Sequence, residues 1–148
     1  MKKILIATDG SPAAREAVEA GLELAGEHAS KVTFLHVVST IDWRVARLGP
    51  SRPRPHRLEI TEEDTALHEA AALANEKGIE YELELIAGET ADEIAIYGDL
   101  IGADLIVVGS RGLGAIAGAV LGSVSRAVLH QAKCPVLVVR GSRAPVAV

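Results

Sequence analysis

The sequence predicts a single α/β domain: an open, parallel, five-stranded sheet in the order 3-2-1-4-5 with helices on both faces. Short apolar runs rich in Val, Ile and Leu alternate with segments that carry helical start and stop signals, and this alternation is typical of a parallel sheet covered by helices. The third run, YELELIA at 81–87, alternates apolar and acidic residues, which is typical of a half-exposed edge strand. Because crossovers between parallel strands are right-handed, we expect the chain to wind outward to that edge and then return to the other side of the first strand.

The first helix is expected to begin at Ser11, a good N-cap residue, with Pro12 in its first turn, and to end near His28. The last helix is expected at about 123–132. In chain order, the strands are expected at KKILIAT (2–8), KVTFLHVV (31–38), YELELIA (81–87), DLIVVG (104–109) and VLVVR (136–140).

Two further helices are predicted from capping boxes, in which a side chain at the start of a helix and one three residues later satisfy each other's backbone amides. One helix opens with Thr61 and Asp64, and the other with Thr90 and Glu93. Glycines are common just after a helix ends. The glycines that close these two helices are Gly78 and Gly102.

Composition and charge narrow the classes of function. The 148 residues carry a net charge of −5 and only 3% aromatic side chains, so the chain is poorly suited to bind nucleic acid. Acidic residues stop at Asp104, whereas five basic residues follow it, and this basic end suits a small anionic ligand. The single cysteine, Cys134, cannot form a disulfide within the chain. No signal-peptide pattern precedes ILIAT, so we expect a cytoplasmic protein.

The glycine-rich segment GSRGLGAIAGAVLGSVS, residues 109–125, holds five of the fourteen glycines. It begins where the fourth strand ends, just as Asp9 follows the first strand. In the predicted strand order the chain passes from one side of the first strand to the other between these two strands. The crevice outside their carboxyl ends is the expected ligand site. Gly122 and Ser123 would open the last helix, whose N-terminal amides favour phosphate, and glycines let the backbone approach a ligand closely.

A membrane helix and two familiar nucleotide-binding loops fit this segment poorly. A membrane helix is excluded because only fourteen residues separate Arg111 from Arg126, whereas a span needs roughly 20. Residues 112–117 match the dinucleotide-binding pattern G-x-G-x-x-A, but they follow the fourth strand and no acidic residue comes after them to hold a ribose. A Walker A loop is excluded because Gly-Lys does not occur. One alternative stays open, a connection that packs tightly and binds nothing.

The spacing G-x2-G-x9-G-S at 109–123, after LIVVGSRG and before KCPVLVV, resembles the universal stress protein family. ILIATDGS at the start and TFLHVV in the second strand resemble the same family. The resemblance runs from residue 2 to about residue 140, apart from the segment 39–60. It implies a Rossmann-like fold of the adenine nucleotide alpha hydrolase type. Because every glycine of the pattern is present, it also implies the ATP-binding subclass.

The family pattern implies a nucleotide site. Asp9 would hold the ribose hydroxyls, and the backbone of Val37 would contact the adenine edge. Gly109 would lie against the ribose and the first phosphate, while Gly112 and Gly122 would line the phosphate cradle. A Mg²⁺ or Mn²⁺ ion would be held mostly by phosphates and waters rather than by a dedicated cluster of side chains. The candidate binding residues are Ala7, Thr8, Asp9, Val37, Gly109, Arg111, Gly112, Gly122, Ser123, Val124 and Ser125, the last as an additional phosphate contact.

We expect a nucleotide-dependent stress-response or signalling module with little or no catalysis. Phosphoryl transfer needs a metal, a positioned nucleophile and cationic stabilisation, and the glycine-rich segment offers no lysine and no evident base. We interpret His36, inside a strand, as structural, His130 as too far along the last helix, and Cys134 as a small buried apolar residue. One alternative is an enzyme, either a slow ATPase or an adenylate-handling hydrolase. Another is a module that binds AMP or a cyclic nucleotide in the same crevice.

Two segments of the sequence are relevant to the protein partners that we expect. The strand at 136–140 is apolar up to its final arginine and would leave an exposed edge, so we expect a homodimer in which a second copy pairs with it. The resemblance also implies dimers. The segment 39–60 is expected to be a flexible loop, and its part WRVARLGPSRPRPHR (43–57) holds five arginines and three prolines. That part is either a mobile solvated loop, a flap over the phosphates, or a contact for a protein partner that the sequence does not identify.

Overall fold

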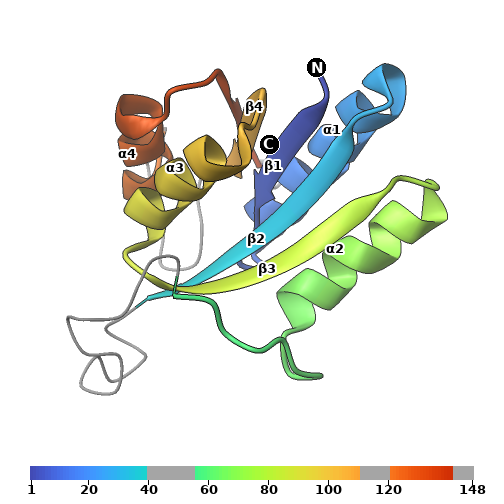
Figure 1. The fold of residues 1–148 in the computed structure, drawn as a ribbon, viewed down its shortest axis with the longest axis horizontal. Coiled ribbons are helices and arrows are strands. Elements are labelled where there is room, and N and C mark those ends of the chain that lie inside the picture. Colours follow the sequence, from blue (N-terminus) through green and yellow to red (C-terminus); the bar gives the residue numbers. More distant parts are fainter. Residues whose placement is uncertain (40–55, 111–120, 142–148) are drawn as a thin grey trace, which may run out of the picture.

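A computed structural model describes residues 1–39, 56–110 and 121–141, which form one parallel sheet with the strand order β3-β2-β1-β4-β5 and helices on both faces (Figure 1). This confirms the predicted α/β architecture and strand order. The strands are β1 (Lys3–Ala7), β2 (Lys31–Ser39), β3 (Tyr81–Gly88), β4 (Leu105–Gly109) and β5 (Val136–Val139). The helices are α1 (Pro12–His28), α2 (Thr65–Glu76), α3 (Thr90–Ile101) and α4 (Ser123–Gln131).

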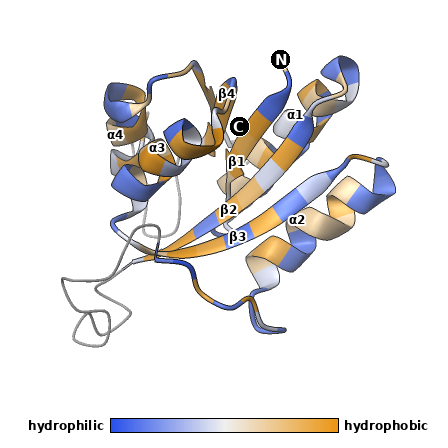
Figure 2. Cartoon of the chain, in the orientation of Figure 1, coloured by the Kyte–Doolittle hydropathy of each residue, from blue (hydrophilic) through white to orange (hydrophobic). Residues whose placement is uncertain are grey.

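The sheet has an apolar core on each face, because side chains alternate between faces along each strand. Ile4 and Ile6 of β1 lie in the core under α1 and α2, whereas Leu5 lies in the core under α3 and α4. All three are fully buried. Figure 2 shows apolar colour along the central strands and a mixture of apolar and hydrophilic colour along the helices. None of the helices in the described part of the chain is long and apolar enough to cross a membrane.

The start of α1 confirms the predicted cap. The Oγ atom of Ser11 accepts a hydrogen bond from the backbone N–H of Ala14 at 3.2 Å, and Pro12 occupies the first helical position. The helix ends at Ala29, which adopts a left-handed backbone conformation with φ of 52°. The Ser11 cap fixes where the chain turns from β1 into α1, next to the predicted ligand crevice.

The predicted capping box of Thr61 and Asp64 is wrong as a helix start. Asp64 accepts a hydrogen bond from the N–H of Thr61 at 2.6 Å, but its side chain caps no amide of α2, which begins only at Thr65. The N–H of Glu63 donates to the hydroxyl of Thr61. Both bonds lie within residues 61–64, so Thr61 and Asp64 stabilise a turn that precedes the helix.

The predicted capping box of Thr90 and Glu93 is also wrong, although α3 does occupy the expected range. The N-cap is Glu89, whose Oε2 atom accepts from the N–H of Asp92 at 2.8 Å. Glu93 is instead buried, with 2% of its surface exposed. Its side chain occupies the space that a Cβ at Gly88 would need, so the glycine at the end of β3 makes room for a buried carboxylate.

The predicted loop 39–60 is too wide at both ends. Ser39 is the last residue of β2, and residues 56–58 lie along the outer edge of β3. There the N–H of Leu58 donates to the carbonyl of Leu85 at 2.8 Å, and the N–H of Ala87 donates to the carbonyl of His56 at 3.0 Å. Most of the arginine-rich segment 43–57 lies outside the described residues. The half-polar edge strand is therefore partly covered by the chain itself.

Candidate functional site

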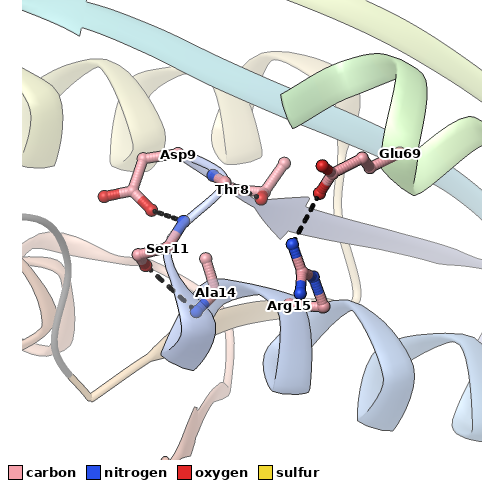
Figure 3. A network of polar contacts seen from close by, with 7 residues as sticks. Thr8, Asp9, Ser11, Ala14, Arg15 and Glu69 are labelled. Carbon is pink, nitrogen blue, oxygen red and sulfur yellow. Dashed lines mark hydrogen bonds and ion pairs between the residues drawn. The ribbon is translucent and has the colours of Figure 1, made fainter. Parts of the chain in front are cut away.

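The crevice predicted at the switch point begins with the turn that follows β1. The N–H of Thr8 still bonds to the carbonyl of Leu35 in β2 at 2.9 Å, and the chain then turns away into α1. The Oδ1 atom of Asp9 accepts from the N–H of Ser11 at 2.9 Å (Figure 3). Gly10 has φ of +79°, a left-handed conformation that glycine adopts at low cost. This turn places Asp9, a predicted ribose ligand, at the carboxyl end of β1.

Thr8 and Ala7, two further predicted site residues, lie at the same end of β1. Ala7 is half-buried and is the last residue of the strand. Thr8 is buried, and its hydroxyl accepts from the N–H of Gly10 at 3.2 Å. That hydroxyl therefore has a role in the turn itself, whether or not a ligand is bound.

The main chain of Val37 faces the space beyond the end of β1. The main-chain groups of successive β2 residues point in turn to β1 and to β3. The carbonyl of Leu35 accepts from Thr8 on the β1 side, whereas the N–H of Val32 donates to Glu80 on the β3 side. Val37 comes two residues after Leu35, so its N–H and C=O point to the β1 side. Because β1 ends at Ala7, opposite Leu35, the strand does not reach Val37. One donor and one acceptor of β2 are thus aimed into the crevice.

Gly109 closes β4 against the first turn of α1. A Cβ on this glycine would contact the backbone of Ala13 and Ala14. The need for glycine at this position therefore has a structural reason within the protein, independent of any ligand. The contact predicted between Gly109 and a nucleotide stays a prediction.

The start of α4 lies next to Ser110, the residue that follows β4. Gly122 is the N-cap of α4, with an extended backbone, and no side chain among the described residues caps the helix. The carbonyl of Gly122 accepts from Arg126, and its N–H donates to the carbonyl of Ser110. Ser123 is exposed, and Val124 is 37% exposed. Because the first amides of a helix have no partner inside the helix, this end offers N–H groups to an anion.

The hydroxyl of Ser125 is used inside the protein. Its Oγ atom lies 3.2 Å from the carbonyl oxygen of Ser110 and 3.0 Å from that of Gly122, and Ser125 is 2% exposed. Ser110 is a residue that the sequence reasoning missed, since its role depends on a main-chain carbonyl. Two predicted site residues, Arg111 and Gly112, lie outside the described residues.

The other candidate reactive residues, His36, His130 and Cys134, lie on different elements of the fold. His36 lies in β2, and burial lowers its pKa below the usual 6.5, an effect that the nearby carboxylates of Asp9 and Asp64 oppose. His130 is exposed on the last turn of α4, and Cys134 is half-buried before β5. Within residues 1–39, 56–110 and 121–141, no three His, Cys, Asp or Glu side chains lie together in a way that could hold a metal ion.

A comparison of the sequence with known families decides the classification. The profile described as the universal stress protein family matches residues 1–140. The chain belongs to the universal stress protein family. The chain is 36% identical to universal stress protein YxiE of Bacillus subtilis over 145 residues, and the alignment covers 93% of this chain and 98% of the relative.

Solved structures show the same fold. Hypothetical protein MJ0577 superposes with a TM-score of 0.74 and 26% identity, covering 97% of this chain and 98% of the other. A universal stress protein in complex with cAMP superposes with a TM-score of 0.69 and 27% identity, covering 95% and 98%. The five-stranded sheet of this protein is thus the family's α/β fold.

Proposed function

We propose that this universal stress protein binds an adenine nucleotide, with ATP as its ligand, and that the bound nucleotide regulates its contacts with a partner. The observation that carries the proposal is the start of α4, which no side chain of the described residues caps and which is bonded to Ser110 at the carboxyl end of β4. A helix N-terminus in this place favours phosphate through its amides and its dipole. The relative crystallised with cAMP supports a nucleotide rather than another anion.

The other side of the crevice suits the nucleoside. Asp9 accepts hydrogen bonds and can accept from ribose hydroxyls, but its charge would repel bare phosphates, so the ribose is expected at β1 and the phosphates at α4. The main chain of Val37 offers one donor and one acceptor to the base. Arg111 and Gly112 complete the proposed site, and a Mg²⁺ or Mn²⁺ ion would be held there by the phosphates and water.

Calorimetric titration of nucleotide-free protein tests the proposal. ATP, AMP and cAMP are titrated in turn, with and without Mg²⁺, and melting temperature is followed in parallel because a ligand that binds only the folded state raises it. We expect ATP to bind and AMP and cAMP to bind more weakly, since they offer fewer phosphate oxygens to α4. If none of the three gives heat or a thermal upshift on well-folded protein, the proposal is overturned.

We further propose that catalysis is slow or absent, so that the nucleotide acts as a signal. His36 and His130, the histidines nearest in sequence to the predicted site, lie respectively inside the sheet and on the last turn of α4. Neither is positioned as a base beside the start of α4. Release of phosphate from ATP and Mg²⁺, measured over many minutes, checks this. Many turnovers per minute, lost in the Asp9→Asn variant, would make the protein an ATPase instead.

We also propose a homodimer through β5. All four residues of this strand are only partly buried in the single chain, although each is Val or Leu. An apolar edge strand is a site for pairing with another chain. A second copy of β5 would cover it.

A further inference from the structure

Ser110 joins three elements around the crevice through its main chain. Its N–H donates to the carbonyl of Val139 in β5 at 2.8 Å, and its carbonyl accepts from the N–H of Gly122, the N-cap of α4. The hydroxyl of Ser125 lies 3.2 Å from the same carbonyl. Ser110 is 3% exposed, so water competes little for these bonds. We call the group formed by the Ser110 carbonyl, the Gly122 N–H and the Ser125 hydroxyl the loop latch.

The proton of the Ser125 hydroxyl is committed to the loop latch. A serine hydroxyl has one proton to donate, and among the residues that the structure describes the acceptors within reach of Ser125 are the carbonyls of Ser110 and Gly122. Carbonyl oxygens only accept, so the hydroxyl must be the donor in either contact. Phosphate oxygens that carry no proton also only accept. Ser125 can therefore bond to a phosphate only by giving up both carbonyls.

We infer that Ser125 is a positioning residue: it holds the N-cap of α4 against the end of β4 and so aims the amides of Ser123 and Val124 into the crevice. The loop latch joins residues 110, 122 and 125. The carbonyl of Ser110 accepts from the N–H of Gly122, and the one proton of the Ser125 hydroxyl is donated to the carbonyl of Ser110 or to that of Gly122. The inference rests on the proposed nucleotide site for its purpose, but the loop latch itself is a property of the free protein.

Amide hydrogen exchange in the nucleotide-free protein tests the loop latch without any ligand. Gly122 is expected to be protected in the wild type, and exchange of its N–H is expected to accelerate roughly tenfold in Ser125→Ala, since one buried hydrogen bond is lost. Ser125→Thr keeps the hydroxyl and should restore protection. Ser123→Ala, which removes an exposed hydroxyl from the same turn, should leave the exchange of Gly122 unchanged.

Binding of ATP and of adenosine, measured on the same variants, tests the purpose. We expect Ser125→Ala to weaken ATP several-fold, to leave adenosine unchanged, and to be rescued by Ser125→Thr. Weaker ATP binding with unaltered exchange at Gly122 would make Ser125 a direct phosphate ligand and overturn the inference. An unprotected Gly122 amide in the wild type would overturn it without any variant. If the wild type binds no adenine nucleotide while Gly122 is protected, the proposed function fails and the loop latch stands.

Discussion

A Cβ at Gly109 would lie 2.9 Å from both the carbonyl carbon and the carbonyl oxygen of Ala13. The last residue of β4 and the first turn of α1 are therefore in backbone contact, and this contact brings the start of α1 to the switch point of the sheet. The same glycine belongs to the spacing that predicts a nucleotide site. Its absence of a side chain is explained by helix packing before any ligand is considered.

Gly109→Ala is expected to destabilise the protein by about 1–3 kcal/mol, because the added methyl group must displace backbone rather than a flexible side chain. Urea denaturation measures the change. Gly26→Ala is the matched control: Gly26 lies in α1 with nothing within 4 Å of an added Cβ, so alanine should stabilise the helix by about 0.5–1 kcal/mol. Equal stability of Gly109→Ala and the wild type would contradict the role assigned to packing.

Asp9→Asn separates the charge of Asp9 from its role in the turn. The amide oxygen of asparagine can still accept from the N–H of Ser11, so the unfolding free energy should change by less than about 0.5 kcal/mol. A carboxylate that accepts from ribose hydroxyls makes charged hydrogen bonds of about 1.5–3 kcal/mol, so ATP affinity should fall by more than about tenfold. Urea denaturation measures the unfolding free energy, and calorimetric titration measures the affinities for ATP and for 2′-deoxy-ATP. The wild type should discriminate between them and the variant should not; discrimination that survives in the variant would remove Asp9 from the ribose site.

The main chain of Val37 predicts a preference for adenine over guanine. A backbone N–H and C=O side by side match the ring nitrogen acceptor and the amine donor of adenine. Guanine presents a donor and an acceptor in the reverse order, so both contacts become mismatched. We expect GTP to bind at least about tenfold more weakly than ATP. Competition against a fluorescent ATP analogue measures the ratio, and equal affinities would show that the base is held elsewhere.

The strand order could be predicted because one strand, Tyr81–Gly88, shows its position in its own pattern of acidic and apolar residues. The start of α1 could be predicted because Ser11 caps a helix that begins directly after it. The caps of α2 and α3 could not: Thr61 and Asp64 form a turn ahead of α2, and Thr90 is already the first residue of α3, behind the N-cap Glu89. For α3, the deciding facts are the burial of Glu93 and the space left by Gly88, which depend on packing.

In the candidate site, too, some features could be predicted from the sequence and others depend on contacts between distant residues. Asp9 and the start of α4 lie where the alternation of strands and helices predicts the crevice. The link between Ser125 and Ser110 could not be predicted, because one of the two carbonyls that can accept the proton of Ser125 lies fifteen residues away in the chain. Main-chain acceptors carry no signal in a sequence. Contacts between the binding residues and a nucleotide remain predictions for the experiments above.

His36 predicts that stability falls in mild acid. The Nδ1 atom of its ring is buried and makes no hydrogen bond within the described part of the chain, and burial lowers its pKa from 6.5. Between the unfolded value of 6.5 and the lower folded value, the unfolded chain binds more protons. The contribution of His36 is therefore fully present above pH 6.5 and is lost as the pH falls through the folded pKa. Urea denaturation at several pH values should show the loss in the wild type and a smaller slope in His36→Phe; equal slopes would place the pH dependence in other groups.

Val138 tests the proposed dimer through the direction of its N–H. The carbonyls of Pro135 and Val139 accept from Ile106 and Ser110 on the β4 side, so the alternation along β5 turns the N–H of Val138 to the open edge. Val138→Pro removes that donor and leaves the bonds to β4 in place, and edge strands tolerate proline. We expect the wild type to sediment as a dimer at micromolar concentration and the proline variant to dissociate at least about tenfold more readily, since each edge hydrogen bond contributes about 1 kcal/mol. Val138→Thr keeps the N–H and should stay dimeric. A monomeric wild type, or a proline variant that dimerises like the wild type, would mean that β5 does not form the interface.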